Sequence, residues 1–483
     1  MAGPTITPTN RGPIQAGPPA WAGPRRFYFT RVAAQQRTDS HASSLFERTL
    51  ALGAFALLLF FYVALPSLKF LGLPLRGWLS LGTLSFLILA RPAVVAAALS
   101  RYFPLIGLAA GLALLGIFVS VANGNSIDVI VQTLLEVHFQ IVVLILVTAI
   151  LAEICGGRLC MWAIIAVIGG SAFIAVLQML DVDLAWDVRR SLGPLSKEEL
   201  QPSVVDRRPT GLSYSPIQLS TQLCLAFAAF TAVRYAERLR EFGRRQADPA
   251  VILALIILFA GSIAVATRSP ILGGAVFLLT YGMLHRQIWL ALMIAAGAAV
   301  LYLAWPLLLG FIENEAPRVL RTDDKSAAAR SVFAYYGIRL FIDNPVGYGF
   351  AFHPAELWAP YWPELYMMRG SRGTQENMLH NYVLSMVNIY GIGILLFAPL
   401  AIRLLRRAAF YSIFFIPYGV HILFHNSGPY YSDTIIWFVI AAIGTAAAKT
   451  IHSQASPMPG PAFAMPDALG AGSKNQIRGV HSL

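Results

Sequence analysis

The 483-residue chain contains few charged residues. Only 12% of its residues are charged, whereas 57% are hydrophobic, and the mean hydropathy is +0.63. An average soluble domain has about 25% charged residues. This deficit excludes an ordinary soluble protein and predicts a helical protein that crosses a membrane many times.

Cysteine is scarce as well. The chain has 3 cysteines: Cys155 and Cys160 flank a short loop, and Cys224 lies inside an apolar run. A C-x4-C pair without two further ligands is a poor zinc site, and thiols in a cytoplasmic loop stay reduced. We therefore expect these cysteines to be free and structural.

Acidic residues are outnumbered by basic residues, 24 against 36, which gives a net charge of +12. Such an excess also occurs in nucleic-acid-binding proteins, but no RNA- or DNA-binding motif is present here. The arginines lie mostly in short loops between apolar runs, which follows the positive-inside rule. We expect cytoplasmic termini, no nucleic-acid partner, and two long loops outside, at Asp181–Ser215 and Phe311–Met378.

Apolar runs recur along the chain, most of them near the length that crosses about 30 Å of hydrocarbon. Their number predicts about twelve transmembrane helices, the first of which can serve as an uncleaved insertion signal. The runs are Leu50–Pro66, Leu73–Ala90, Tyr102–Val121, Asp128–Ala152, Leu159–Leu180, Pro216–Tyr235, Ala250–Thr267, Pro270–Leu284, Gln287–Gly310, Leu379–Ile402, Phe410–Phe424 and Tyr431–Ala448.

The ends of the chain differ from this apolar domain. Residues 1–44 and 453–483 are rich in Pro, Gly and Ala and show no apolar period. Such segments bury too little apolar surface to fold, so we expect disordered cytoplasmic tails. The predicted fold class is all-α: a polytopic membrane domain at residues 45–452 with a large, partly helical outer loop.

That outer loop carries two signals. Ala327–Phe341 has helical spacing, and the turn Asp343-Asn344-Pro345 stops it. Aromatic residues then cluster, and their flat faces suit sugar rings and a bilayer interface equally well. They are Phe350, Phe352, Trp358, Tyr361, Trp362 and Tyr366.

Three polar residues lie at the edges of apolar runs. They are Arg208, Arg268 and His380, the last followed by Asn381. Ionisable groups at membrane depth are costly and are commonly functional. Each also has a structural interpretation, because arginine can reach lipid phosphate and histidine can cap a helix. Together they suggest a site at the membrane surface for an anionic, lipid-linked substrate.

Other polar patterns favour structural roles. Gln132, Glu136 and Gln140 form one stripe, which we interpret as helix packing or a cavity wall. The pair Asp181 and Asp183 is more typical of a solvated helix end than of a metal site.

A histidine pair also has the spacing of metal ligands. His421 and His425 are four residues apart, as two ligands on a helix can be. No third ligand is evident, so we interpret both as wall or interface residues.

An ordered set of motifs resembles a known family. The motifs are Arg208-Pro209-Thr210-Gly211, Thr267-Arg268-Ser269, Arg330 ahead of Asp343-Asn344-Pro345-Val346-Gly347-Tyr348-Gly349, and His380-Asn381 with Gly391. The set, on this topology, resembles the O-antigen polymerase and O-antigen ligase superfamily, often called Wzy-type. The likeness covers roughly Gln201–Gly444.

The resemblance implies a glycosyltransferase on the periplasmic face of a bacterial inner membrane. The donor would be a glycan on undecaprenyl diphosphate, and the acceptor a second lipid-linked glycan or a lipid A–core sugar. Family transfer is thought to invert the anomeric centre without a metal, and no cofactor is implied. Membrane lipids and a polysaccharide chain-length regulator are the further partners implied.

The same chemistry suggests roles for the residues. Guanidinium groups bind phosphate oxygens in pairs, so Arg208 and Arg268 are expected to stabilise the diphosphate leaving group. His380 is the candidate base, because histidine titrates near neutrality. Arg330, Arg339 and Asn381 are candidate substrate-binding residues.

Three alternatives remain open at this point. A polymerase and a ligase need the same donor chemistry, and the long aromatic loop favours a polymerase because it suits a growing chain. A transporter or flippase would also have about twelve spans, but usually with polar sites in mid-membrane and inverted halves. A non-catalytic assembly subunit would have no need for Arg208, Arg268 and His380 together.

Overall fold

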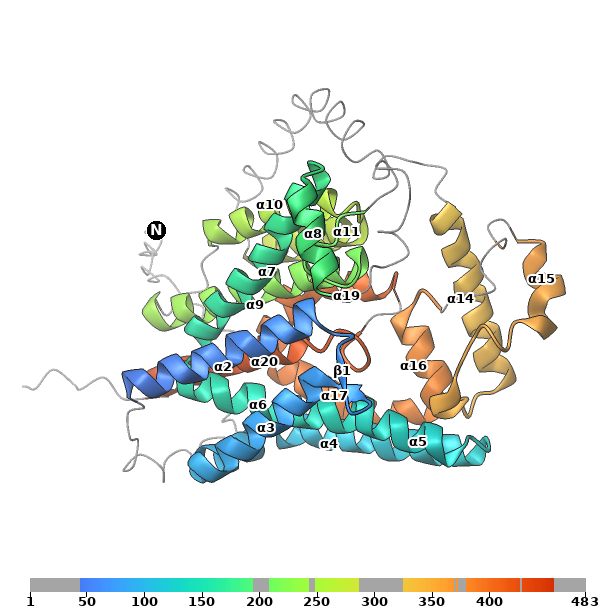
Figure 1. Cartoon of the computed structure of the whole chain (residues 1–483), viewed down its shortest axis with the longest axis horizontal. Helices are drawn as coiled ribbons and strands as arrows, with labels where there is room; N and C mark the ends of the chain where they lie inside the picture. Colours follow the sequence, from blue (N-terminus) through green and yellow to red (C-terminus); the bar gives the residue numbers. More distant parts are fainter. Residues whose placement is uncertain are drawn as a thin grey trace, which may run out of the picture. The chain divides into compact units, whose positions relative to one another are not determined.

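The computed structural model describes residues 44–193, 208–242, 248–285, 325–368, 371, 379–425 and 428–455 (Figure 1). These residues are predominantly helical, as the composition predicts. The strands among them are β1 (Lys69–Phe70) and β2 (Leu73–Pro74), which form one short antiparallel hairpin. The predicted tails lie outside the described residues, except Ser44 and residues 453–455, which continue the last helix.

The described residues up to His285 form helices that are mostly apolar, with the charged helix α8 as an exception. They are α2 (Leu45–Ala64), α3 (Leu75–Ala90), α4 (Pro92–Ala122), α5 (Ile127–Thr133), the π-helical turn η2 (Leu134–Phe139), α6 (Gln140–Cys155), α7 (Gly157–Met179), α8 (Asp183–Ser191), α9 (Pro216–Phe242), α10 (Pro249–Ala264) and α11 (Ser269–His285).

The second half is more interrupted. It consists of α14 (Lys325–Asp343), η3 (Gly349–Ala351), η4 (Ala359–Tyr361), α15 (Trp362–Tyr366), α16 (Tyr382–Tyr390), η5 (Gly391–Phe397), α17 (Ala398–Arg407), α18 (Ala409–Ser412), η6 (Ile413–Phe415), α19 (Ile416–Ile422) and α20 (Ile436–Ala455).

These helices have the apolar character of membrane spans. Six helical stretches are long and apolar enough to cross a membrane, and five shorter apolar helices accompany them among the described residues. Most agree closely with the predicted runs; α7, for example, occupies Gly157–Met179 where Leu159–Leu180 was expected. The predicted span Gln287–Gly310 lies outside the described residues. The chain is therefore an all-α membrane protein.

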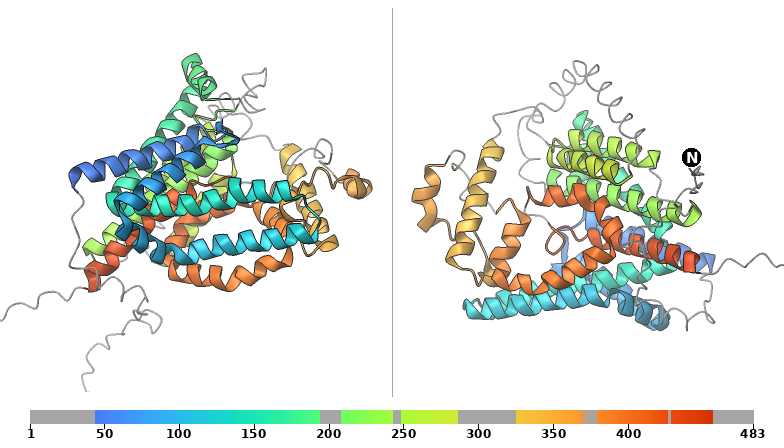
Figure 2. Two further views of the ribbon diagram at one scale, coloured as in Figure 1. Left: turned by 60° about the horizontal axis from the view of Figure 1, so that its bottom comes forward. Right: turned by 180° about the vertical axis from the view of Figure 1, so that it is seen from behind.

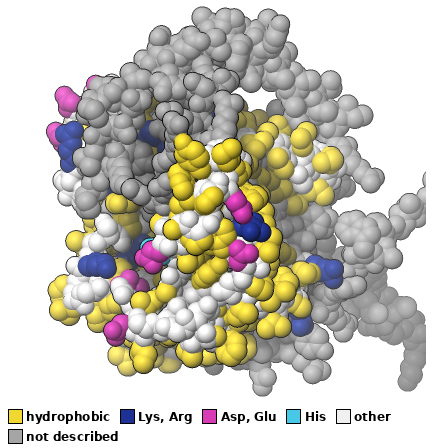
Figure 3. Space-filling model, turned by 90° about the vertical axis from the view of Figure 1, so that its right-hand side faces the viewer, with side chains coloured by type: hydrophobic (Ala, Val, Ile, Leu, Met, Phe, Trp, Pro, Cys, Tyr) yellow, Lys and Arg dark blue, Asp and Glu magenta, His cyan; other side chains and the backbone are white. Residues whose placement is uncertain are grey.

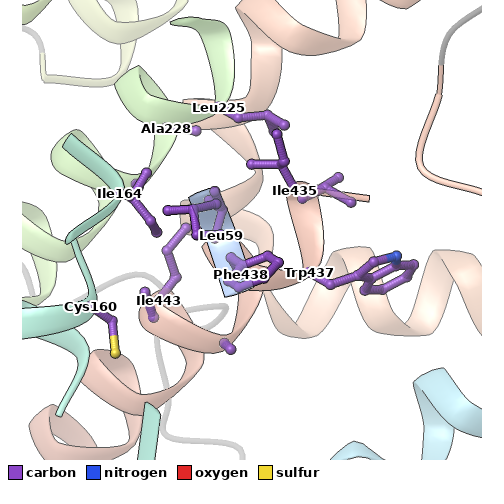
Figure 4. Packing of buried hydrophobic residues seen from close by; sticks show 14 of the residues in the cluster. Leu59, Cys160, Ile164, Leu225, Ala228, Ile435, Trp437, Phe438 and Ile443 are labelled. Atoms are coloured by element: carbon purple, nitrogen blue, oxygen red, sulfur yellow. The ribbon is translucent and has the colours of Figure 1, made fainter. Parts of the chain in front are cut away.

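The main hydrophobic core forms where α20 packs against α6, α7 and α9, with α2 alongside (Figure 4). Phe438 of α20 is fully buried and meets Phe55 edge to face, with ring centroids 5.1 Å apart. A Cβ on Gly157 would overlap the carbonyl oxygen of Ala442. Small residues of this kind let membrane helices approach closely and gain packing contacts.

A second, smaller core lies in the region that sequence analysis assigned to the long outer loop. It joins α14, the segment Phe352–Trp358 and α15, beside α16 (Figures 1 and 2). Its buried members include Tyr336, Phe352 and Trp358, and Tyr336 meets Trp358 at 4.7 Å. Phe350 packs instead toward the main core. Most of the clustered aromatics therefore have a packing role that neither sequence interpretation included.

Two glycines let the loop after α14 rest on the end of α16. Gly391 has a φ of +62°, and a Cβ there would overlap the carbonyl oxygen of Val346. Gly347 has a φ of +93°, and the Ile392 N–H donates to the Pro345 carbonyl at 2.8 Å. α16 therefore ends at Tyr390, where this loop crosses it, and the predicted span Leu379–Ile402 continues through η5 and α17 as one candidate membrane span, Tyr382–Arg406.

We expect the Gly391→Ala variant to lose thermal stability. The variant needs both an unfavourable backbone angle and displacement of the Val346 carbonyl, which together cost about 1–3 kcal/mol or more. Unfolding of the purified protein in detergent measures the effect. Gly107→Ala is the matched control, because its Cβ would meet no heavy atom within 4 Å. Equal unfolding temperatures for Gly391→Ala and Gly107→Ala would contradict the proposal that this backbone position requires glycine.

Candidate functional site

The Arg208 segment is held by one glutamine of α7. The Gln178 Oε1 atom accepts the backbone N–H groups of Thr210 and Gly211, each at 2.9 Å, and its Nε2 donates to the Gly211 carbonyl at 3.2 Å. Gly211 has a φ of +59°, and a Cβ there would overlap the Ser171 carbonyl oxygen. The Arg-Pro-Thr-Gly motif therefore forms a tight turn against α7 that fixes the arginine beside it.

Arg208 connects this turn to the end of α10. Its side chain is 9% exposed, and Nη2 donates to the carbonyls of Val265 and Ala266 at 3.3 and 3.2 Å. A cation at a helix C-terminus also offsets the helix dipole. The following residue, Thr267, lies 2.6 Å from Ser220, hydroxyl to hydroxyl. Arg208 thus helps to position the turn that carries Arg268 and Ser269.

Ser269 lies between two buried histidines. Its Oγ is 2.9 Å from His421 Nδ1 and 3.2 Å from His425 Nε2, and the two imidazole rings are 4.4 Å apart. The exposed fractions are 7% for Ser269, 0% for His421 and 5% for His425. A Cβ on Gly273 would lie 2.7 Å from Pro417 Cα, so α11 and α19 meet closely here. These three residues are called the Ser269 cluster below.

Two further predicted residues approach the Ser269 cluster from outside. The Arg330 guanidinium carbon lies 5.6 Å from the ring centre of Phe424, the neighbour of His425. His380 is half-buried against Phe333, with ring centroids 4.9 Å apart. The charges of Arg330, His380 and Arg208 all act on His425. Segments far apart in the sequence therefore place two arginines and a second imidazole near one buried imidazole.

The other predicted residues lie elsewhere. Arg268 is exposed, although its neighbour Ser269 is buried. Asn381 caps α16, where its Oδ1 accepts the Leu384 N–H at 3.0 Å. Arg339 Nε lies 3.7 Å from Glu364 Oε2, with both side chains partly exposed. Arg208, Arg330 and His380 are thus brought together, whereas substrate roles for Arg268, Asn381 and Arg339 stay predictions.

The polar stripe of the fourth predicted span has neighbours on other elements. Gln132 donates to Glu136 at 3.1 Å, and Glu136 lies 3.7 Å from Lys69 Nζ. A Cβ on Gly77 would be 2.9 Å from the Gln140 amide. The Gln140 contact joins α6 to α3, the Glu136 contact joins η2 to the β1–β2 hairpin, and the Gln132–Glu136 bond lies within one helical stretch.

The possible metal ligands stand apart from the site. Asp183 begins α8, and Asp181 precedes it with a φ of +56°. Cys155, Cys160 and Cys224 are buried thiols that form no disulfide with one another. Among the residues that the structure describes, no group of three or more His, Cys, Asp and Glu side chains is arranged to hold a metal. The side chains of the site are arginine, imidazole and hydroxyl groups, which suit an anion.

Sequence reasoning assigned His421 and His425 to a helix wall and gave Ser269 no role. The four-residue spacing of the histidines was a signal, since it places both on one face of a helix. The partner was not visible, because Ser269 is 152 residues from His421 in the sequence.

No protein-family model and no curated protein matches the chain. The geometry above and the sequence pattern are therefore the basis for a functional proposal.

Proposed function

We propose that this protein is a glycosyltransferase that joins undecaprenyl-diphosphate-linked oligosaccharide repeats into an O-antigen or exopolysaccharide. The observation that carries the proposal is the gathering of Arg208, Arg330 and His380 around His425 in a membrane protein. Arginine side chains from separate segments, close to one buried imidazole, offer charged hydrogen-bond donors to an anion. A diphosphate on a lipid carrier is an anion that reaches such a site from the bilayer.

The proposed reaction uses these groups in one displacement. The acceptor hydroxyl oxygen attacks the anomeric carbon while the carbon–oxygen bond to the diphosphate breaks. The electron pair leaves with the diphosphate, whose charge Arg208 and Arg330 stabilise, together with Arg268 at the exposed edge. His380 takes the hydroxyl proton. Attack opposite the leaving group inverts the anomeric centre.

The polymerase assignment rests on the surface near α14 and α15, which Figure 3 shows. Tyr335 is 40% exposed and donates to Glu364 Oε2 at 3.0 Å, beside Arg339. Tyr366 is 50% exposed. Exposed tyrosines with charged neighbours offer both the flat faces and the polar edges that sugar rings bind. We propose that successive sugars of a growing chain contact this surface on the periplasmic side.

The alternatives differ in what they require. A ligase would use the same donor site and a lipid A–core acceptor. A transporter would need a passage, and the described helices leave a cavity of about 10 Å³ between Tyr62, Arg76, Gln222 and Asp433. That volume holds about one water molecule. The cavity therefore gives a transporter little support.

Deletion of the gene separates these functions. A polymerase deletion should leave single repeat units on the lipid carrier or on the cell surface, because no step joins them. The glycans are extracted, released from lipid and sized on a gel, with the complemented strain as control.

The other outcomes assign the other functions. Long polymer stranded on the carrier, with bare lipid A–core outside, would replace the polymerase by a ligase. Unchanged glycan of every size, with altered uptake of a small solute, would contradict both and favour a transporter.

A further inference from the structure

His425 has one imidazole nitrogen in a hydrogen bond and one without a partner. Nε2 faces Ser269 Oγ at 3.2 Å. Nδ1 is buried and has no hydrogen-bond partner among the described residues, although the side chain is only 5% exposed. An unpaired buried polar atom costs about 1–3 kcal/mol, so its persistence in a packed site suggests that a ligand completes it.

The charges around His425 restrict what it can do. Arg208, Arg330, His380 and His421 all act on it, and it lies in a buried, low-dielectric position. A positive charge on His425 would be opposed first by desolvation and then by the two arginines. His425 is therefore poorly suited to accept a proton from a substrate. As a neutral imidazole it can still donate one N–H.

The Ser269 hydroxyl can fix which nitrogen carries that proton. Serine has one proton to donate and can accept from a neighbour. In one arrangement His421 Nδ1–H donates to Ser269 Oγ, and the Ser269 hydroxyl donates to His425 Nε2. Both contacts are then satisfied, and the proton of His425 stands on Nδ1. His425 Nδ1 then carries the proton and can donate it in a hydrogen bond to an anion that the nearby arginines attract.

We propose that His425 Nδ1–H donates a hydrogen bond to the diphosphate of the lipid-linked substrate, and that Ser269 and His421 are positioning residues that hold it in this tautomer. The proposal rests on the proposed function for the identity of the anion. The arginines supply the positive charge. The neutral imidazole adds a hydrogen-bond donor and no further positive charge that the arginines would repel. Donors to charged groups are the strong class of hydrogen bond.

Binding rather than turnover tests this proposal. The full-length protein in nanodiscs is titrated with a short polyprenyl diphosphate N-acetylglucosamine. His425→Ala should weaken binding by about 10- to 100-fold, and His425→Asn should recover part of the loss, because the Asn amide places an N–H near the position of Nδ1. Ser269→Ala should weaken binding less. Ser262→Ala is the matched control, since Ser262 is equally buried and donates only to the Leu258 carbonyl.

The protonation state has its own readout. ¹⁵N shifts of labelled histidine, assigned through His425→Ala, should show Nδ1–H on His425 in the complex. Affinity should be level across roughly pH 6–8, because a neutral donor does not titrate there, whereas a cationic imidazole loses its charge near about pH 6.5. An Nε2–H tautomer, or affinity that falls with rising pH only when His425 is present, would overturn the proposal.

Competing anions separate this proposal from the proposed function. Inorganic pyrophosphate and phosphatidylglycerol vesicles are titrated in parallel. Stronger His425-dependent binding of the lipid diphosphate supports the proposal. Equal binding of the lipid diphosphate by wild type and His425→Ala would overturn the role of His425 and leave the glycosyltransferase proposal intact. Pyrophosphate binding that also depends on His425 supports recognition of the diphosphate itself. If the wild type binds phosphatidylglycerol as well as the lipid diphosphate, the diphosphate subsite proposal is wrong.

Discussion

His380→Ala should abolish glycan polymerisation while leaving the protein in the membrane. In the proposed reaction His380 takes the acceptor proton, and loss of a general base costs about 100- to 10,000-fold in rate. The side chain is half-buried against Phe333, at the edge of the second core, so its removal disturbs little packing. Complementation of the deletion strain, followed by glycan sizing, measures the loss, and a membrane immunoblot measures the protein.

A second histidine of the same region provides the control. His353 is exposed in the segment between η3 and η4. His353→Ala should therefore polymerise normally. Wild-type glycan from His380→Ala would remove His380 as the base. Loss of glycan in both variants would point to a general disturbance of this region.

Arg208→Ala should lower the rate of transfer by about 100- to 1,000-fold, the usual effect of removing one preorganised electrostatic contact. Arg208→Lys should also be poor, because lysine cannot donate two parallel hydrogen bonds to phosphate. Arg208 has a structural role as well, since it donates to Val265 and Ala266. Some stability should therefore be lost along with the rate, and reconstituted protein with a lipid-linked repeat measures kcat and KM separately.

An Arg189→Ala variant distinguishes the catalytic role of Arg208 from its structural role. Arg189 is 2% exposed, and its Nε donates to the Ser213 carbonyl at 2.9 Å, so it is also a buried arginine on a backbone oxygen. Arg189→Ala should lower the unfolding temperature but retain kcat in the folded fraction. If Arg208→Ala and Arg189→Ala lose stability alike and both keep kcat, Arg208 is a structural arginine only.

The membrane helices were predictable because their signal is local. A run of apolar residues must satisfy its own backbone hydrogen bonds in lipid, so composition over about 20 residues decides the structure. The turn at Gly211 was not predicted, although its motif was identified. The end of α16 at Gly391 was not predicted either, because it depends on the Pro345–Gly349 loop crossing α16, and only tertiary packing brings the two together.

The candidate site was partly predictable for the same reason. Arg208 and His380 were identified because ionisable residues are conspicuous at the edges of apolar runs, and Arg330 was identified through the family resemblance. Ser269 and His425 are ordinary residues by type, and their importance arises only when α11 packs on α19. The aromatic cluster gave the opposite result: its composition suggested a binding surface, but burial of Phe352 and Trp358 makes much of it a core.

The π-helical turn η2 has a consequence for the whole predicted span Asp128–Ala152. A π-turn accommodates one more residue than an α-turn, and each residue in a helix advances the side-chain direction by about 100°. A helical wheel drawn continuously across Ile127–Cys155 therefore assigns the residues after Phe139 to wrong directions. The offset turns His138 toward Phe350 and Tyr430, at 5.0 and 5.1 Å. Loss of a single residue from Leu134–Phe139 would restore an ordinary α-helix and rotate all of α6 against its neighbours.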